Sequence, residues 1–277
     1  NDYLGLAYLP NESNAASGST GSRLLTGNSS LAEDLEKNIA SFHGYEDGIL
    51  FTCGYMANVG LLSIIADSCD VIFFDAFIHA SSRDGIRLSQ GRAFAFRHND
   101  LMHLQQKLKN CSAKGERFIV VESIYSQDGS IAPLHDICCL AKRYQSHVIV
   151  DEAHAVGVFG PHGRGLVAEH NLTSSLFAQI VTFGKALGSH GAIVLGSGLL
   201  KQALLNFATP YIYTTAVSLQ ALASIKKSYN LFPEMDDARN HLHTLIQTFC
   251  NARGKVSFTP IQAVRIKGNE AVQLASK

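Results

Sequence analysis

Three side chains that could take part in catalysis follow short apolar runs in this sequence. Asp151 and His154 come directly after Val148–Val150, and Lys185 lies in the small-residue turn 182–188 after another apolar run. In open α/β sheets, ligands bind beyond the carboxyl ends of the strands, so side chains that follow strands are candidates for a site. A carboxylate, an imidazole and a primary amine in such positions predict an active site.

The chemistry that best uses this set is Schiff-base chemistry with pyridoxal phosphate. A lysine in a water-poor pocket can form an imine with the aldehyde of this cofactor, whose ring then acts as an electron sink. The ring needs a carboxylate at its nitrogen and a donor at its phenolate oxygen, which Asp151 and His154 could supply. The phosphate needs backbone N–H groups, which Gly54 and Tyr55 offer at a predicted helix start, and the Thr182 hydroxyl could add to them.

Each candidate also has an ordinary structural explanation when it is considered alone. Asp151 could cap a strand end, and His79 or His154 could be a buried histidine with satisfied hydrogen bonds. Lys185, in a glycine-rich turn, could be an exposed surface lysine. The catalytic interpretation therefore depends on the occurrence of all these residues together and in this order.

The sequence Asp151-Glu152-Ala153-His154 also matches the DEAH box of nucleic-acid helicases. That box works with a phosphate loop of the form G-x-x-x-x-G-K-[ST], but the Gly-Lys pairs at 184–185 and 254–255 are followed by Ala186 and Val256. Lys plus Arg and Asp plus Glu both number 23, so the formal net charge is zero. This balance does not favour a nucleic acid or an anionic membrane as a partner.

The cysteines and the hydropathy indicate the cellular compartment. No apolar run reaches the roughly 18 residues that a membrane span requires. Six cysteines occur without C-x-x-C pairs or zinc-finger spacing. We therefore expect a cytoplasmic protein with reduced thiols and no metal site.

The segments that must position the candidate residues alternate between apolar strands and amphipathic helices. We expect strands at 48–52, 71–74, 93–96, 118–121, 148–150, 179–183 and 192–195. We expect helices at 30–42, 54–65, 80–88, 100–109, 133–144, 199–207, 219–231 and 234–251. Because the strands are almost continuously apolar, this order predicts an α/β fold with a mostly parallel central sheet and helices on both faces.

The same order divides the chain into three parts. Residues 1–30 are polar and form an N-terminal segment, and residues 31–232 form the large domain. Residues 233–277 begin a smaller C-terminal α/β domain, with a strand expected at 263–266 and a helix at 270–276. Because the sequence ends after this first unit, we expect the small domain to be truncated.

Short motifs occur in one order along nearly the whole chain. They lie at residues 1–6, 18–28, 51–58, 79–81, 122–129, 151–157, 163–165, 182–188 and 213–215. This set resembles the α-oxoamine synthases, pyridoxal-phosphate enzymes of fold type I. The resemblance implies a large domain like that of aspartate aminotransferase.

The resemblance implies a role in catalysis for four residues. Lys185 would form the Schiff base with the cofactor and move the Cα proton of the amino acid. Asp151 would pair with the pyridine nitrogen, and His154 would pair with the phenolate oxygen. His79 would stack on the face of the ring.

Further residues would bind the phosphate and the substrate. The resemblance implies that Gly54, Tyr55 and Thr182 hold the phosphate, with Thr214 and Thr215 reaching in from a second subunit. Ser126 would lie near the ring and the substrate carboxylate, and Asn1 would reach that carboxylate across a dimer interface. A homodimer with shared active sites follows from these roles.

The resemblance also bears on the substrates. Residues 182–185 and 163–165 are most like those of the members that condense L-alanine with a pimeloyl thioester, carried by coenzyme A or a carrier protein, in biotin biosynthesis. Residues 96–100 and 125–129 also resemble those of the members that condense glycine with succinyl-CoA. A non-catalytic partner subunit is the alternative from another class of function.

The sequence departs from the family pattern at three places. Cys53 stands where the family usually has serine, and the spacing between Pro10 and Ala15 is shorter than in the family. The family carries an arginine for the amino-acid carboxylate in its C-terminal domain, and this sequence ends before that position. We therefore expect the substrate site to lack this arginine.

Overall fold

The computed structural model describes residues 2–8, 18–112, 114–253 and 257–263, and its centre is a seven-stranded sheet. The strand order across the sheet is β1-β7-β6-β5-β4-β2-β3. The strands are β1 (Asp47–Phe51), β2 (Val71–Asp75), β3 (Arg92–Phe96), β4 (Arg117–Glu122), β5 (His147–Asp151), β6 (Ala178–Thr182) and β7 (Ala192–Gly196). The seven strands predicted between residues 48 and 195 are all present, with small differences at the ends.

One strand of the sheet runs against the others. Strands β3, β2, β4, β5 and β6 are parallel, whereas β7 is antiparallel to both of its neighbours, β6 and β1. The connection 183–191 between β6 and β7 is too short for the crossover that a parallel pair needs. The prediction of a mostly parallel sheet is confirmed, and the carboxyl ends of β1, β4, β5 and β6 lie on one edge.

Several helices begin at polar residues whose side chains cap them. The Ser29 side chain accepts a hydrogen bond from the Ala32 N–H at 3.3 Å, and the Asp100 carboxylate accepts one from the His103 N–H at 2.8 Å. The helices of the described ranges are α1 (Ser30–His43), α2 (Gly54–Leu62), α3 (Ala80–Leu88), α4 (Leu101–Lys109), α5 (Leu134–Arg143), α6 (Leu166–Glu169), α7 (Gly198–Phe207), α8 (Thr209–Ile212), α9 (Leu219–Leu231) and α10 (Asp236–Arg253). The sequence does not predict α6 and α8, because each makes about one turn and shows no periodicity.

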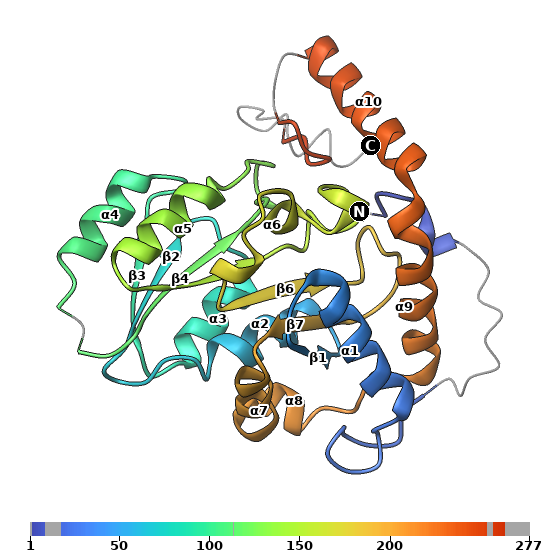
Figure 1. Ribbon diagram of the computed structural model, residues 1–277, viewed down its shortest axis with the longest axis horizontal. Helices are drawn as coiled ribbons and strands as arrows, with labels where there is room; N and C mark the ends of the chain where they lie inside the picture. Colours follow the sequence, from blue (N-terminus) through green and yellow to red (C-terminus); the bar gives the residue numbers. More distant parts are fainter. Residues whose placement is uncertain (1, 9–17, 113, 254–256, 264–277) are drawn as a thin grey trace, which may run out of the picture.

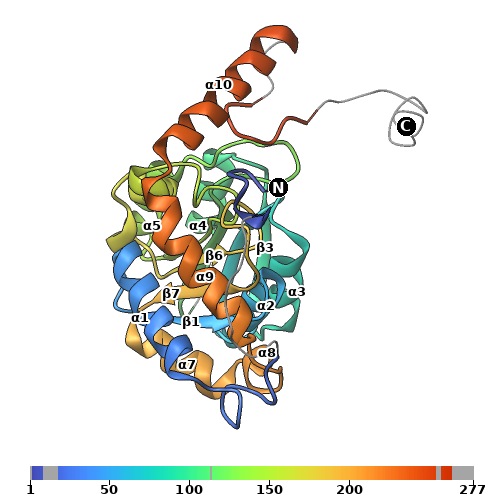
Figure 2. The ribbon, with the colours of Figure 1, turned by 90° about the vertical axis from the view of Figure 1, so that its right-hand side faces the viewer.

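Two apolar clusters pack against the sheet, and at β1 they lie on opposite faces. On β1, Ile49 and Phe51 belong to the cluster that contains Leu61 of α2, whereas Leu50 belongs to the cluster that contains Leu35 of α1. Alternate residues of a strand point to opposite faces, so the two memberships define the two sides. Figure 2 shows α2 and α3 on one side of the strands and α1 and α5 on the other. The prediction of helices on both faces is confirmed.

The last described elements leave the α/β body. Helix α10 follows α9 and projects beyond the sheet and its covering helices (Figure 1). Residues 257–263 contain no strand or helix and contact Gly129. The remainder of the strand and the whole helix expected at 263–266 and 270–276 lie outside the described residues. The domain boundaries near residues 30 and 232 therefore remain predictions.

The described ranges contain neither a candidate membrane span nor a candidate metal site. None of their helices is long and apolar enough to cross a lipid bilayer. No group of three or more His, Cys, Asp or Glu side chains in the same ranges could hold a metal ion. All six cysteines are unpaired.

Candidate active site

A cavity of about 350 Å³ opens beyond the strand ends that carry the candidate residues. Its walls come from the segments that follow β1, β2, β4, β5 and β6. The cavity brings together seven residues that the sequence singles out: Gly54, Tyr55, His79, Asp151, His154, Thr182 and Lys185. The strand-end rule thus predicted which parts of the chain meet here.

Lys185 lies in the connection between β6 and β7 and contacts a histidine. Its Nζ lies 2.9 Å from Nε2 of His154, and Nδ1 of His154 lies 2.8 Å from the Tyr3 hydroxyl. Burial lowers the pKa of Lys185 from its ordinary value, and the Asp151 and Glu122 carboxyl groups oppose that change. Burial and then the Lys185 charge lower the pKa of His154 to about 3, so its ring is neutral near pH 7.

Asp151 ends β5 with only 7% of its surface exposed, and its carboxylate is held from two sides. The Asn58 side-chain amide donates to Oδ2 at 2.8 Å, and the Ala153 N–H donates to Oδ1 at 2.9 Å. Asn58 is itself fixed, because its Oδ1 accepts a hydrogen bond from the Ser82 hydroxyl at 3.1 Å. These contacts fix the orientation of the Asp151 carboxylate at the cavity wall.

Glu122 is a second carboxyl group beside Asp151. It ends β4 and pairs with Asp151 across the sheet, and its Oε1 is buried without a hydrogen-bond partner among the described residues. Burial and then the Asp151 charge raise the pKa of Glu122 to about 8. Glu122 is therefore largely protonated near pH 7, and the cavity does not carry two adjacent negative charges.

His79 stands at the start of α3 and lines the same cavity. Its Nδ1 accepts a hydrogen bond from the Ser81 N–H at 3.2 Å and lies 2.7 Å from the Ser81 hydroxyl. The helix start thus fixes the position of the imidazole ring on the cavity wall.

The first turn of α2 is suited to bind an anion. Its N-cap residue, Cys53, makes no side-chain hydrogen bond to the helix, so no cap side chain satisfies these N–H groups. The Thr182 hydroxyl is buried without a partner among the described residues. Thr182 packs so closely on Gly54 that a Cβ there would lie 2.6 Å from Thr182 Cγ2. N–H groups and an unpaired hydroxyl around one space fit a phosphate, so the cavity as a whole fits pyridoxal phosphate.

Comparison with known proteins agrees with this geometry. The model of the aminotransferase class I and II family matches residues 1–265. A putative 8-amino-7-oxononanoate synthase from Bacillus licheniformis is 40% identical over 291 residues, and the match covers 100% of this chain and 76% of that protein. The chain belongs to the α-oxoamine synthase family.

Solved structures place this α-oxoamine synthase among enzymes of fold type I. A serine palmitoyltransferase from S. paucimobilis, solved with PLP and myriocin bound, has a TM-score of 0.89 at 27% identity and covers 97% of this chain and 74% of its own. An 8-amino-7-oxononanoate synthase from Francisella tularensis has a TM-score of 0.84 at 29% identity and covers 99% of this chain and 82% of its own. The predicted family and fold class are confirmed.

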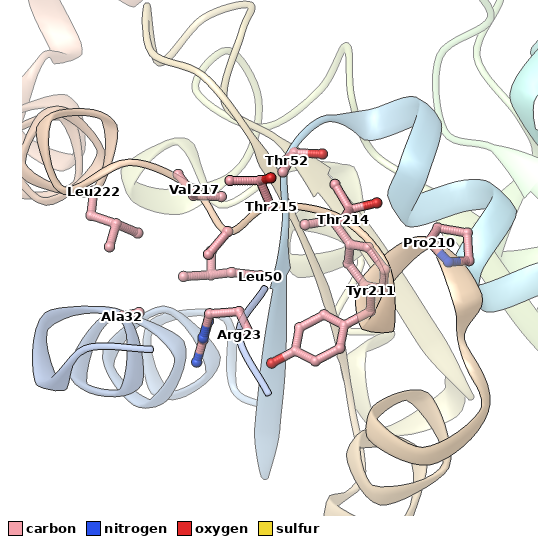
Figure 3. A pocket seen from close by; sticks show the side chains of 12 residues that line it. Arg23, Ala32, Leu50, Thr52, Pro210, Tyr211, Thr214, Thr215, Val217 and Leu222 are labelled. Atoms are coloured by element: carbon pink, nitrogen blue, oxygen red, sulfur yellow. The ribbon is translucent and has the colours of Figure 1, made fainter. Parts of the chain in front are cut away.

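Three described residues that the family resemblance assigns to the site, Ser126, Thr214 and Thr215, do not line the Lys185 cavity. Ser126 lies in the loop after β4, outside the residues that form the cavity wall. Thr214 and Thr215 line a separate small cavity with Arg23 and Tyr211, as Figure 3 shows. Asn1 lies outside the described residues. The roles of these four residues in the α-oxoamine synthase site remain predictions.

Three residues of this α-oxoamine synthase site were given no role by the sequence reasoning. Tyr3 comes from the N-terminal segment, far from His154 in the chain, and no local pattern indicates their contact. Asn58 could have been noticed, because it is a polar residue within the apolar stretch 56–62 of α2. Glu122 begins the motif at 122–129, directly after the strand expected at 118–121, but the sequence indicates no role for it.

The glutamate of the DEAH sequence, Glu152, connects parts of the fold. Glu152 is fully buried and does not line the cavity. Its Oε1 accepts hydrogen bonds from the Leu166 and Val167 N–H groups at 2.8 and 3.1 Å, and its Oε2 accepts one from Gln179 at 3.0 Å. Glu152 therefore joins α6 to β6, and no helicase chemistry is needed to explain it.

Proposed function

We propose that this protein is a pyridoxal-phosphate-dependent 8-amino-7-oxononanoate synthase. It would condense L-alanine with a pimeloyl thioester, carried by coenzyme A or a carrier protein, and release carbon dioxide in biotin biosynthesis. The observation that carries the proposal is the position of Lys185 in one cavity with Asp151 and His154. The 40% identity with the Bacillus licheniformis protein supports these substrates within the family.

Pyridoxal phosphate, when bound, supplies an aldehyde that condenses with amines and a ring that withdraws electrons from the amino-acid Cα. Lys185 would bind the aldehyde carbon, Asp151 would hold the ring nitrogen, and His154 would donate to the phenolate oxygen. His79, fixed by Ser81, would lie against the ring face and exclude water there.

The phosphate would be bound by the first turn of α2 and by Thr182. The N–H groups of Gly54 and Tyr55 supply donors from the backbone, and the unpaired Thr182 hydroxyl supplies another. The Tyr55 ring is 45% exposed and its hydroxyl donates to Asp84 at 2.6 Å, so the contribution of Tyr55 to the phosphate is its backbone.

Lys185 would also move the substrate proton. Because burial lowers its pKa, more of Lys185 is neutral near pH 7 than for an exposed lysine, and the neutral amine can accept the Cα proton at Nζ. The His154 ring, 2.9 Å from Nζ, fixes the direction of the amine, and the Tyr3 hydroxyl fixes the ring. After carbon dioxide leaves, the same Nζ can return a proton to the product carbon.

A second copy of the chain would complete the site. We propose a homodimer in which Thr214 and Thr215 contact the phosphate in the partner's cavity, while Asn1 and Ser126 contact the substrate carboxylate. Thr215 is exposed and Thr214 half-buried, so a neighbouring subunit could reach both residues. The six unpaired cysteines support a reducing compartment such as the cytoplasm.

The test begins with the cofactor. Reconstitution with pyridoxal phosphate should give a visible absorption band that borohydride bleaches, and peptide mapping should find the reduced adduct on Lys185. Lys185→Ala should remove both the band and the adduct. Lys226→Ala, at an exposed lysine of α9, should keep both. An adduct on another lysine would contradict the assignment.

The substrates are then tested by solvent-deuterium exchange at Cα. L-alanine should exchange faster than glycine or L-serine, and pimeloyl-CoA should give a product and carbon dioxide. Preference for glycine with succinyl-CoA would instead indicate the related synthase chemistry. A protein that binds the cofactor but exchanges no amino acid would indicate the non-catalytic partner subunit.

A further inference from the structure

The loop after β4 is closed by its own backbone around Ser126. The Gly129 N–H donates to the Tyr125 carbonyl at 2.9 Å, and the Tyr125 N–H donates to the Ser130 carbonyl at 3.0 Å. Ile124 and Ile131 form an isolated β-bridge at the base of this loop. Any shift of Gly129 is therefore transmitted to the turn that contains Ser126.

A segment that is remote in sequence forms hydrogen bonds to this loop through two hydroxyl groups. Ser257 Oγ donates to the Gly129 carbonyl at 2.5 Å, and Thr259 Oγ1 donates to the same carbonyl at 3.1 Å. Thr259 is fully buried, and Ser257 is 7% exposed. We call residues 257–262, with these two hydroxyls, the clasp.

The clasp has a defined internal structure. The Thr259 N–H donates to Ser257 Oγ at 3.1 Å, and the Gln262 side-chain amide donates to the Ser257 and Thr259 carbonyls at 2.8 and 2.7 Å. These bonds hold both hydroxyls toward Gly129 at once. The clasp follows α10, so it joins the end of that helix to the loop.

Gly129 is shaped for this contact. Its φ of 72° is in the left-handed region, and a Cβ there would collide with the Ile261 carbonyl and would lie 2.8 Å from Thr259 Oγ1. Only glycine allows the clasp to approach so closely without strain. The close approach indicates a specific interface and not a loose contact.

The loop also contacts the cavity wall. The Ala132 N–H at the base of the loop donates to the Ser123 carbonyl at 3.0 Å, and the Ser123 N–H donates to the Asp151 carbonyl at 2.9 Å. Asp151 and Glu122, which directly precedes Ser123, both line the Lys185 cavity. The clasp is therefore connected through Gly129 and the loop to the cavity wall.

We propose that Ser257 and Thr259 are positioning residues that hold the Ser126 loop in the conformation required to bind the amino-acid substrate. The proposal rests on the proposed function for the identity of that substrate. The hydroxyls touch neither substrate nor cofactor, so they act only through the loop. Removing them should weaken amino-acid binding while the phosphate site, built on other strands, keeps its affinity.

Hydrogen exchange tests the clasp without any assay of activity. Thr259→Val removes one buried hydroxyl at nearly constant volume, and the Gly129 amide should then exchange about tenfold faster, since a buried hydrogen bond is lost. Thr259→Ser should restore the wild-type rate. Thr248→Val is the matched control, because Thr248 is exposed on α10 and its hydroxyl bonds, among the described residues, only to the Thr244 carbonyl.

The cofactor-loaded protein supplies the second measurement. The L-alanine concentration that gives half of the spectral change should rise about tenfold in Thr259→Val, with the pyridoxal phosphate Kd changed less than about twofold. Ser257→Ala carries the same test if the valine variant does not fold. Unchanged exchange at Gly129 in both variants would overturn the clasp, and faster exchange with an unchanged alanine response would overturn its positioning role. If the wild-type protein gives no alanine response, the proposed function fails, and the exchange measurement still decides whether the clasp holds the loop.

Discussion

Nζ of Lys185 lies 2.9 Å from Nε2 of His154 in the cavity at the edge of the sheet. A neutral imidazole has one accepting and one donating nitrogen, and the Tyr3 hydroxyl occupies the other nitrogen at 2.8 Å. The Tyr3 hydroxyl therefore influences which ring nitrogen of His154 carries the proton. An N-terminal residue thus helps to orient the candidate catalytic amine.

Tyr3→Phe should remove the influence of the Tyr3 hydroxyl on which His154 nitrogen carries the proton. We expect the free energy of unfolding to fall by about 1 kcal/mol, because a buried ring nitrogen loses its partner, and pyridoxal phosphate to bind several-fold more weakly. Urea unfolding of the apoprotein and titration of the visible band measure the two effects. Tyr144→Phe, at the end of α5 and outside the cavity lining, is the control. Equal effects in both variants would argue against the Tyr3–His154 contact.

Asn58→Leu should disturb Asp151 without touching it. The Asp151 Oδ2 loses its 2.8 Å donor and the Ser82 hydroxyl loses its acceptor, so we expect the affinity for pyridoxal phosphate to fall about tenfold. Ser82→Ala, which removes only the outer contact, should cause a smaller loss. Equilibrium titration of the wild type and the two variants with pyridoxal phosphate measures the three affinities. An equal loss of affinity in both variants would show that the direct hydrogen bond from Asn58 to Asp151 does not determine cofactor binding.

Gly54→Ala should displace Thr182 from the phosphate site. The new Cβ would come within 2.6 Å of Thr182 Cγ2, so the threonine must move and its hydroxyl must leave its position. We expect the Kd for pyridoxal phosphate to rise about tenfold, the cost of roughly one hydrogen bond to a charged group. The double variant Gly54→Ala/Thr182→Ser keeps the hydroxyl and removes Cγ2, so it should recover most of the affinity. A double variant as weak as Gly54→Ala would locate the damage in the helix turn itself.

His43 gives a test of stability that does not involve the cofactor. It is buried beside Tyr229, with 3.1 Å between Nε2 and the hydroxyl, and burial lowers its pKa to about 3. The unfolded chain protonates this histidine near pH 6.5, so its contribution to stability is complete above pH 6.5 and is lost as the pH falls toward 3. Between pH 7 and pH 5 the loss should be about 2 kcal/mol.

The comparison of wild type with His43→Gln isolates this contribution. His154, whose pKa is lowered to about 3, changes stability in the same direction, and Glu122, whose pKa is raised to about 8, changes it in the opposite direction. Both groups remain in the variant, so their contributions to the free energy of unfolding cancel when the variant is compared with the wild type. Urea unfolding at pH 7 and pH 5 should therefore show a smaller decrease for His43→Gln, and identical decreases would exclude the buried neutral histidine.

Much of the fold could be predicted from the sequence because its strands are short apolar runs with polar ends. The helices at 80–88 and 219–231 begin and end where the pattern predicts, and the polar residues Ser29 and Asp100 cap the helices predicted near 30–42 and 100–109. The direction of β7 could not be predicted from its residues, since 192–196 is apolar and would suit either direction. The direction of β7 is set by the connection 183–191, which is too short to lead into a parallel strand.

The candidate site divides in the same way. The positions of Lys185, Asp151 and His154 follow from the rule that ligands bind beyond strand ends. Tyr3 and the Ser257 clasp could not be predicted, because their contacts join segments that are far apart in the chain and depend on packing.

The reversed strand β7 also has a consequence for the order of folding. The β6–β7 pair is local in sequence, so the connection that carries Lys185 can form early, at a small entropic cost of loop closure. Phe51 of β1 pairs with Ala192 of β7 across most of the chain, and that slow pairing brings Gly54 to Thr182. We therefore expect the segment that carries the amine to form before Gly54 and Thr182 come together. In refolding experiments, binding of the cofactor should therefore appear only after β1 has paired with β7, so cofactor binding would indicate that the sheet is complete.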